Sequence, residues 1–207
     1  QLPDQLNIET IKKEFENLSD TLNANYEIRY IHKTLKTLIL VSKFDHCLIE
    51  IINKTKNKNL NLSIEAVISN HNDLKKNNSL ENFPFHHFPI NNDKLNQEKR
   101  IIQFIDEKKI DIIILARYMQ ILSQDFVSRF YGKIINIHHS FLPSFKGAKP
   151  YHQAFERGVK IIGATAHFVN QKLDEGPIIE QDVEKVDHEL SPSDLIAIGK
   201  DIESRVL

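Results

Sequence analysis

The chain has 207 residues, with 27 Lys and Arg against 28 Asp and Glu, which gives a formal net charge of −1. A nearly neutral chain has no general positive field for nucleic acid, and its apolar runs are too short to span a bilayer, so neither nucleic acid nor a membrane is an expected partner. The single cysteine, Cys47, cannot form an internal disulfide, which favours the reducing cytoplasm.

The placement of glycine excludes two large classes of nucleotide-binding enzyme. All six glycines lie at or after Gly132. A G-x-G-x-x-G fingerprint after the first strand, or a phosphate-binding P-loop, needs glycines earlier in the chain. We therefore expect neither a nicotinamide-dependent oxidoreductase nor a nucleoside triphosphatase of the usual kind.

Residues 1–34 are expected to form a small module of their own. Residues 8–20 place apolar side chains on one face of a helix, and residues 25–31 alternate apolar and charged side chains as a half-buried strand does. One helix and one strand cannot bury both of their faces, so they predict part of a small α+β domain. The start at Gln1 and the end at Leu207, inside a helical pattern, indicate a piece of a longer protein.

From residue 35 onward, apolar strands alternate with amphipathic helices. Asp45 and Ser123 are expected to cap two of the helices. The alternation predicts an α/β fold with a doubly wound, mostly parallel sheet, in which ligands bind beyond the carboxyl ends of the strands. Strands are expected over residues 37–41, 62–68, 85–89, 111–115, 133–137 and 180–186, and helices over residues 45–52, 94–108, 123–130 and 192–206.

Two short segments carry polar residues that suit an active site. The first, NIHHSFLPSFKG, begins at Asn136 after an apolar run, and an extended backbone puts Asn136 and His138 on the same side, roughly 7 Å apart. The second, GATAHFVNQKLDEGP, supplies His167 and Asp174. His167 suits a structural place in a strand as well as it suits a place in the site, and the acidic pair at Asp174 would by itself be an ordinary turn.

The histidines leave a metal site as an alternative. His138, His139, His152 and His167, with Asp174, are chemically able to bind zinc. The chain has no H-E-x-x-H spacing and offers no thiolate near them. We expect a site without metal.

The order NIH-x-S-x-LP, then GAT-x-HFV, then LDEGPII resembles the formyltransferases that use formyltetrahydrofolate. The variant with His139 (NIHHSFLP), followed by KPYHQAFERGVKIIGATAHFVN, resembles the formyltetrahydrofolate deformylases in particular. The resemblance covers nearly all of residues 35–207. It implies a formyltransferase-fold catalytic domain there, truncated at its carboxyl end, and part of an ACT-like regulatory domain in residues 1–34.

The resemblance implies an enzyme that hydrolyses 10-formyltetrahydrofolate to tetrahydrofolate and formate, which supplies formate for purine synthesis and balances one-carbon folate pools. The folate is the substrate, and no prosthetic group is expected. An amino-acid effector at the ACT-like domain and a homo-oligomer are further expectations. Two alternatives stay open: a formyltransferase of the same superfamily that acts on an amine acceptor, and a non-catalytic folate or amino-acid sensor.

The resemblance assigns catalysis to Asn136, His138 and Asp174. Attack on an amide-like carbonyl needs a donor for the developing oxyanion, which Asn136 offers, and a proton carrier, which His138 offers, while a carboxylate such as Asp174 can orient the imidazole. Residues 42–46 (SKFDH) stand where a sugar-phosphate transformylase carries a glycine-rich phosphate loop, which argues against a phosphorylated acceptor. The implied substrate-binding residues are Met119, Gln120, Ile121, Leu122, His139, Ser140, His167, Val169, Asn170 and Leu173. Gln120 replaces a basic residue that is common in the family, so backbone contacts are expected there.

Overall fold

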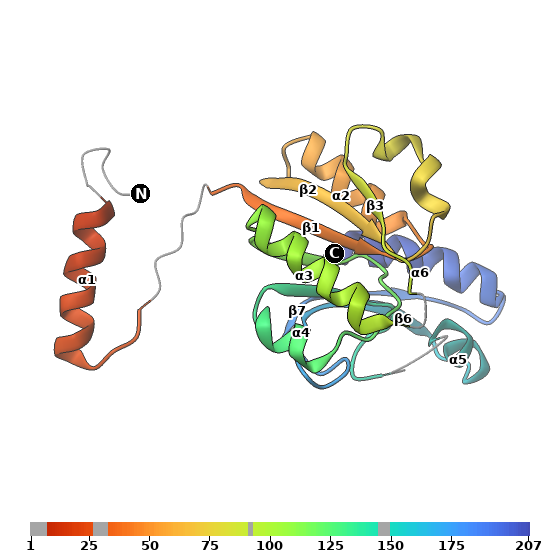
Figure 1. Ribbon diagram of the computed structural model, residues 1–207. Helices are drawn as coiled ribbons and strands as arrows, with labels where there is room; N and C mark the ends of the chain where they lie inside the picture. The colour runs from red at the N-terminus through yellow and green to blue at the C-terminus, as the bar shows by residue number, and fades with distance from the viewer. Residues whose placement is uncertain (1–7, 27–32, 91–92, 145–149) are drawn as a thin grey trace. The chain divides into compact units, whose positions relative to one another are not determined.

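The computed structural model describes residues 8–26, 33–90, 93–144 and 150–207, which belong to two compact units that divide between Lys33 and Thr34. In the first unit, helix α1 (Ile8–Leu22) forms where a helix is predicted (Figure 1). Of the strand predicted over residues 25–31, residues 27–31 lie outside the described residues. No helix in the described part of the chain is long and apolar enough to cross a membrane.

A seven-stranded sheet forms the centre of the second unit, in the order β3-β2-β1-β4-β5-β6-β7. Strands β1 to β5 run parallel, and β6 and β7 continue the sheet antiparallel. The predicted α/β fold with a mostly parallel sheet is therefore confirmed. The strands are β1 (Leu35–Val41), β2 (Leu62–Ser69), β3 (Phe85–His87), β4 (Ile112–Leu115), β5 (Ile134–His138), β6 (Ile161–Phe168) and β7 (Ile178–Lys185) (Figure 1).

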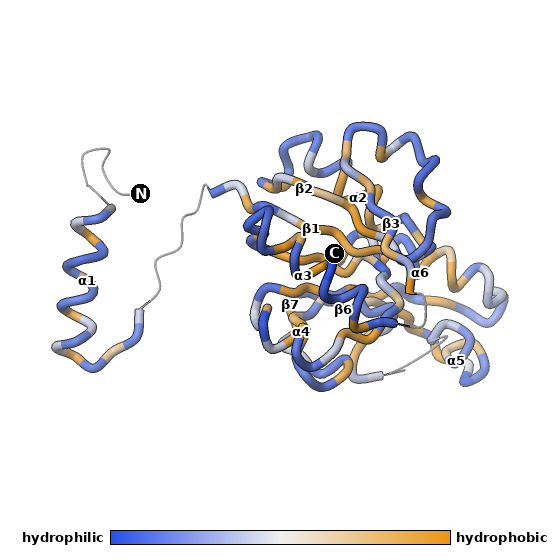
Figure 2. The backbone as a smooth tube through the Cα atoms, in the orientation of Figure 1, coloured by the Kyte–Doolittle hydropathy of each residue, from blue (hydrophilic) through white to orange (hydrophobic). Residues whose placement is uncertain are grey.

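Helices pack on both faces of the sheet, as the term doubly wound requires. The face with Ile39 and Val41 packs with α2 (His46–Lys56), α5 (Pro150–Glu156) and α6 (Pro192–Val206). The face with Leu38 and Leu40 packs with α3 (Lys94–Lys108) and α4 (Gln124–Arg129). Figure 2 shows the hydrophobic residues concentrated along the central strands. Two short 3₁₀ helices, Asp73–Lys76 and Asn78–Leu80, follow β2.

Local sequence explains most helix ends. The Ser123 hydroxyl accepts a hydrogen bond from the Phe126 amide at 3.2 Å, as predicted, and Ser191 begins α6 with a capping box and a proline in the first turn. Asp45 occupies the N-cap position of α2 as predicted, but its side chain makes no capping bond, because its carboxylate accepts instead from the Asn77 side chain at 2.8 Å. Helix α5, with seven residues, is not predicted, because it is too short to show a helical period.

The pairing of β5 with β6 fixes the relative positions of the polar residues. Asn136 pairs with His167, and His138 pairs with Thr165. Ile134 precedes Asn136 by two residues, shares its face, and packs with α3 and α4. Asn136 and His138 therefore lie on the α3 and α4 side of the sheet, at the carboxyl end of a parallel strand.

Candidate active site

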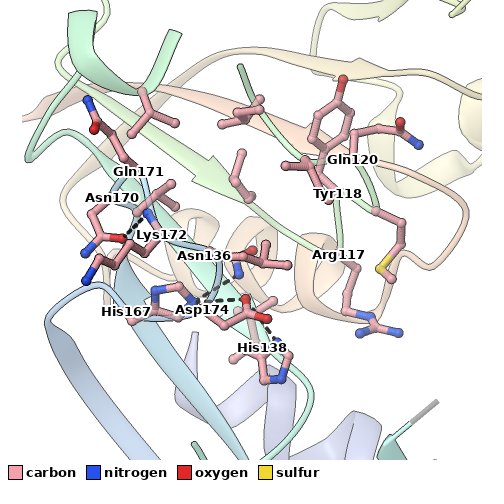
Figure 3. A pocket seen from close by; sticks show the side chains of 18 of the residues that line it. Arg117, Tyr118, Gln120, Asn136, His138, His167, Asn170, Gln171, Lys172 and Asp174 are labelled. Carbon is pink, nitrogen blue, oxygen red and sulfur yellow. Dashed lines mark hydrogen bonds and ion pairs between the residues drawn. The ribbon is translucent and has the colours of Figure 1, made fainter. Parts of the chain in front are cut away.

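A cavity of about 310 Å³ lies beyond the carboxyl ends of β4 and β5. Three segments supply most of its lining: residues 117–122 after β4, residues 136–139 at the end of β5, and residues 169–174 between β6 and β7. Figure 3 shows their side chains around one space. Apolar side chains line the cavity together with polar ones that can orient a ligand, as in many sites for small organic molecules.

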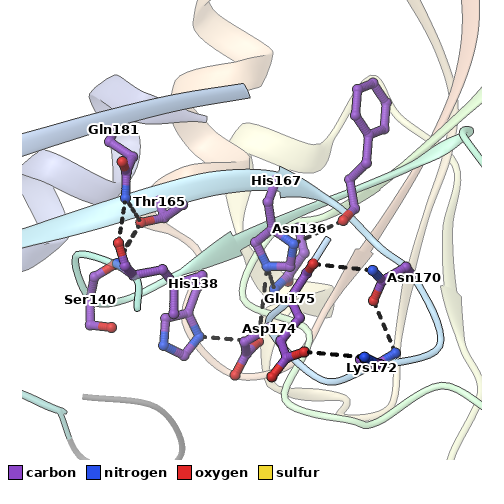
Figure 4. Close-up of polar contacts among 12 residues, drawn as sticks. Asn136, His138, Ser140, Thr165, His167, Asn170, Lys172, Asp174, Glu175 and Gln181 are labelled. Atoms are coloured by element: carbon purple, nitrogen blue, oxygen red, sulfur yellow. Dashed lines mark hydrogen bonds and ion pairs between the residues drawn. The ribbon is translucent and has the colours of Figure 1, made fainter. Parts of the chain in front are cut away.

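His138 and Asp174 meet at this cavity, although 36 positions separate them in the sequence. His138 Nδ1 lies 3.4 Å from Asp174 Oδ1, and the side chains are only 6% and 9% exposed (Figure 4). The other ring nitrogen, His138 Nε2, is buried and has no hydrogen-bond partner among the described residues. The carboxylate orients one side of the imidazole, and the second nitrogen stays available for a ligand.

The loop between β6 and β7 holds Asp174 in an unusual backbone conformation, with φ at 56°. Asn170 braces the loop, because its side chain donates to the Glu175 carbonyl at 3.1 Å and accepts from the Lys172 amide at 2.9 Å (Figure 4). A Cβ atom on Gly176 would lie 1.6 Å from the Phe168 carbonyl oxygen, so only glycine allows this close approach.

Asn136 is oriented by His167, a contact that the sequence does not reveal. His167 Nδ1 donates to the Phe168 carbonyl oxygen at 3.0 Å, because a carbonyl can only accept. The neutral ring then accepts at Nε2 from Asn136 Nδ2, 3.2 Å away. This bond fixes which end of the Asn136 amide is the nitrogen and leaves its second N–H for a ligand. His167 thus serves as a buried strand residue and as a positioning residue for the site.

The charged states of the site residues follow from burial and neighbouring charges. Burial acts to raise the pKa of Asp174, but the hydrogen bond with His138 and the nearby imidazoles outweigh it and hold the pKa below its usual value. Burial lowers the pKa of His167, and burial together with the Arg117 charge lowers the pKa of His139 to about 3. At neutral pH the cavity therefore contains one carboxylate, Asp174, beside two uncharged imidazoles, His139 and His167.

The crevice between β1 and β4, where the strand order changes direction, is crossed by hydrogen bonds from Ser42. Its amide donates to the Arg117 carbonyl at 3.2 Å, and its hydroxyl accepts from the Met119 amide at 3.0 Å and donates to Asn70 Oδ1 at 2.7 Å. Doubly wound sheets usually bind ligands at this point. Here, hydrogen bonds of Ser42 connect the residues that follow β1, β2 and β4.

A buried ionic cluster lies behind His139, and the sequence does not predict it. Glu203 on α6 is 1% exposed, and its carboxylate accepts from His46 Nε2 and from the Tyr151 hydroxyl, both at 2.7 Å. Arg117 Nε lies 3.2 Å from the same carboxylate. Burial acts to raise the pKa of Glu203, but the His46 hydrogen bond and the Arg117 charge hold it low. One feature of the sequence points to this cluster: Glu203 lies on the same helix face as the buried residues Leu195, Gly199 and Ile202.

The structure places most of the expected site residues around one cavity. Ser140 is the exception: its hydroxyl donates to the Ser144 carbonyl at 2.7 Å, and it lies outside this cavity. Its buried position within the turn after β5 explains why it cannot reach the ligand side. Residues 119–122 form an irregular loop with a bend at Gln120. The expected residues that line the cavity are Met119, Gln120, Ile121, Leu122, Asn136, His138, His139, His167, Val169, Asn170, Leu173 and Asp174.

Two groups of side chains contain atoms of the kinds that bind metal ions. Of the zinc set proposed from sequence, His152 is an exposed residue of α5 that does not line the cavity, and the other four line it without forming a group of ligand atoms close enough to hold an ion. His46, Cys47 and Glu203 do lie close enough to hold an ion. However, Glu203 already accepts two hydrogen bonds and faces the Arg117 cation, and burial raises the pKa of the Cys47 thiol. Neither set suits a metal ion.

Comparisons with known proteins agree with this fold. The family model described as formyl transferase matches residues 35–207. The formyltetrahydrofolate deformylase of Corynebacterium sp. is 46% identical over 97% of this chain and 70% of its own, and that of Synechocystis sp. is 48% identical over 92% and 67%. The crystal structure of a formyltetrahydrofolate deformylase from Pseudomonas putida superimposes with a TM-score of 0.91 at 44% identity, over 100% of this chain and 74% of that one.

These matches define first a formyl transferase fold. The chain belongs to the formyl transferase family and, within it, to the formyltetrahydrofolate deformylases. It spans 67% to 74% of the length of these three relatives.

Proposed function

We propose that this protein hydrolyses 10-formyltetrahydrofolate to tetrahydrofolate and formate. The observation that carries the proposal is the His138–Asp174 pair beside Asn136, in one cavity at the end of β5. Together these groups supply what amide hydrolysis needs: a proton carrier, a group that orients it, and a donor for the oxyanion. In the cell the reaction supplies formate for purine synthesis and balances one-carbon folate pools.

In the proposed mechanism, water attacks the formyl carbon while His138 Nε2 accepts a proton from it. The second N–H of Asn136 donates to the oxyanion that develops on the formyl oxygen. His138 then delivers the proton to N10 as the C–N bond breaks. Asp174 stabilises the imidazolium that exists between these two proton transfers.

The folate is proposed to bind between the two loops of the cavity. Ile121 and Leu122 on one side, and Val169 and Leu173 on the other, offer apolar surfaces to a flat ring. Gln120 carries no charge, so polar contacts in this loop come from its amide and from the backbone. No prosthetic group takes part in this proposal.

Water, and not an amine, is the proposed acceptor. A transferase needs room for a second substrate beside the formyl group. At the point where doubly wound sheets usually bind ligands, Ser42 joins β1, β2 and the loop after β4, and Phe44 lies over Arg117 at 5.5 Å. These contacts favour hydrolysis over formyl transfer.

Residues 1–34 are proposed to be part of an ACT-like regulatory domain with an amino-acid effector. A homo-oligomer in the cytoplasm is proposed with it, because regulatory domains of this type usually pair. An assay of the full-length protein with 10-formyltetrahydrofolate, without any amine, tests the main proposal. Equal amounts of tetrahydrofolate and formate support it. Turnover that requires an added amine would identify a transferase, and folate binding without turnover would identify a sensor.

A further inference from the structure

Arg117 is a buried cation at the cavity whose donors are not fully used. It follows β4, lines the cavity beside His138 and His139, and is only 9% exposed. Its backbone φ is 63°, a left-handed conformation that costs energy for most residues other than glycine. Figure 3 shows the Arg117 guanidinium at the same end of the lining as the His138 ring.

The ion pair with Glu203 does not use up the guanidinium. Glu203 already accepts from His46 and Tyr151, one at each carboxylate oxygen. Arg117 Nε approaches Glu203 at 3.2 Å without hydrogen-bond geometry, and Nη1 has no hydrogen-bond partner among the described residues. A guanidinium is always charged and prefers planar, two-oxygen partners such as carboxylates. A buried donor of this kind without a partner indicates a ligand atom.

A second unpartnered atom lies in the same lining. His138 Nε2 is also buried without a hydrogen-bond partner among the described residues. The His139 ring connects the two, because it lies 5.3 Å from the His138 ring and its pKa is lowered in part by the charge of Arg117. A small planar anion between Arg117 and His138 would satisfy both unpartnered groups.

We propose that Arg117 forms a carboxylate subsite that binds the formate product beside His138. The subsite rests on the proposed function, since hydrolysis is what generates formate there. The water oxygen bonds to the formyl carbon, and the C–N10 bond breaks. One water proton passes through His138 to N10, and the other passes from the new carboxylic acid to His138 Nε2, so that the imidazolium can donate to the formate anion. The formate anion is then bound by the Arg117 guanidinium.

Formate inhibition of turnover tests the subsite. Formate added to the wild-type protein is expected to inhibit it, and Arg117→Met is expected to raise the inhibition constant at least about tenfold, the loss of one charge-assisted hydrogen bond. The KM for the folate should change much less. Lys200→Met is the matched control. Lys200 is a second cation over the Phe44 ring, with Nζ 5.6 Å from the ring centre, and it does not line the cavity. It should leave formate inhibition unchanged.

Removing Arg117 leaves Glu203 buried without its cation, so a second variant is needed. The double variant Arg117→Met with Glu203→Gln removes both charges together and is expected to show the same loss of formate inhibition. Equal formate inhibition in wild type and in a folded Arg117 variant would overturn the subsite.

Formate binding without folate separates this proposal from the activity. Saturation transfer from the protein to ¹³C-formate, measured by NMR, requires no turnover. Binding to wild type that either Arg117 variant abolishes supports the subsite even in a protein without deformylase activity. Wild-type protein that hydrolyses the folate but shows no saturable formate binding keeps the proposed function and eliminates the subsite.

Discussion

His138 Nδ1 lies 3.4 Å from Asp174 Oδ1, while His138 Nε2 has no partner among the described residues. The two nitrogens of one ring therefore have different neighbours. The first is held by a carboxylate, and the second is available to a ligand. This asymmetry gives the site a direction for proton transfer, and the first two predictions depend on it.

Replacing His138 with Ala should lower kcat about 10²- to 10⁴-fold, because no other described group in the cavity is placed to carry the proton. Folate affinity should change little, since the folate is proposed to bind through the two loops. Steady-state kinetics and equilibrium binding measure the two effects separately. His152→Ala, an exposed histidine on α5, is the control and should behave as wild type. Wild-type turnover in His138→Ala would disprove the mechanism.

Asp174→Asn tests the charge of the carboxylate, because Asn keeps the size of the side chain and tolerates the left-handed backbone. We expect kcat to fall about 10- to 10²-fold with little change in affinity. The pKa of Asp174 is held below its usual value, so the carboxylate is ionised in wild type throughout about pH 5 to 9, and the loss should be present across that whole range. Its contribution to stability is lost only as the pH falls through that lowered pKa.

The comparison for Asp174→Asn is Asp106→Asn, a half-exposed carboxylate paired with Arg129. A surface pair of this kind contributes little, so this variant should retain wild-type kinetics. If both variants have the same pH–rate profile as wild type, Asp174 is an ordinary turn residue.

His139 should make the protein sensitive to mild acid. Its pKa in the folded state is about 3, whereas an exposed imidazole titrates near 6.5. Below about pH 6.5 the unfolded chain binds a proton that the folded chain rejects, so the free energy of unfolding falls by up to about 1.4 kcal/mol per pH unit. His139→Asn should flatten this slope in urea unfolding between about pH 7 and 5, and His152→Asn should not. Equal slopes in all three proteins would show that His139 is protonated in the fold.

Prolonged dialysis against a chelator should leave activity unchanged. The one close set of metal-type ligands among the described residues, His46, Cys47 and Glu203, lies beside the Arg117 cation, which repels a metal ion. Elemental analysis of the purified protein should show no stoichiometric zinc. Activity that is lost on chelation and restored by zinc would instead support a metal-dependent site.

The sequence predicts the sheet well because its central strands are apolar on both faces. Runs such as DIIIL before Ala116 have no other stable place than the middle of a parallel sheet. Helices α3 and α6 agree with prediction because they are long and begin at good capping residues, Asp93 and Ser191. The motif around Asn136 and His138 locates the site, because Asn136 lies in the strand predicted over residues 133–137 and His138 follows it directly.

What the sequence does not predict depends on contacts between distant segments. His46 and Glu203 are 157 positions apart, and no local pattern relates them. The left-handed conformations at Arg117 and Asp174 are likewise set by the loops around them and not by their own propensity. The Asn136–His167 bond requires the register between β5 and β6, which the sequence leaves undetermined.

That register makes the site sensitive to chain length. Side chains in a strand alternate between faces, so inserting or deleting one residue in β6 before His167 would move its imidazole to the face now occupied by Ala166 and leave the Asn136 amide free to turn. Such a change adds no bulk to the cavity and removes no catalytic side chain. Among natural variants, differences in length are therefore expected to be absent from residues 134–138 and 161–168, even where substitutions are frequent.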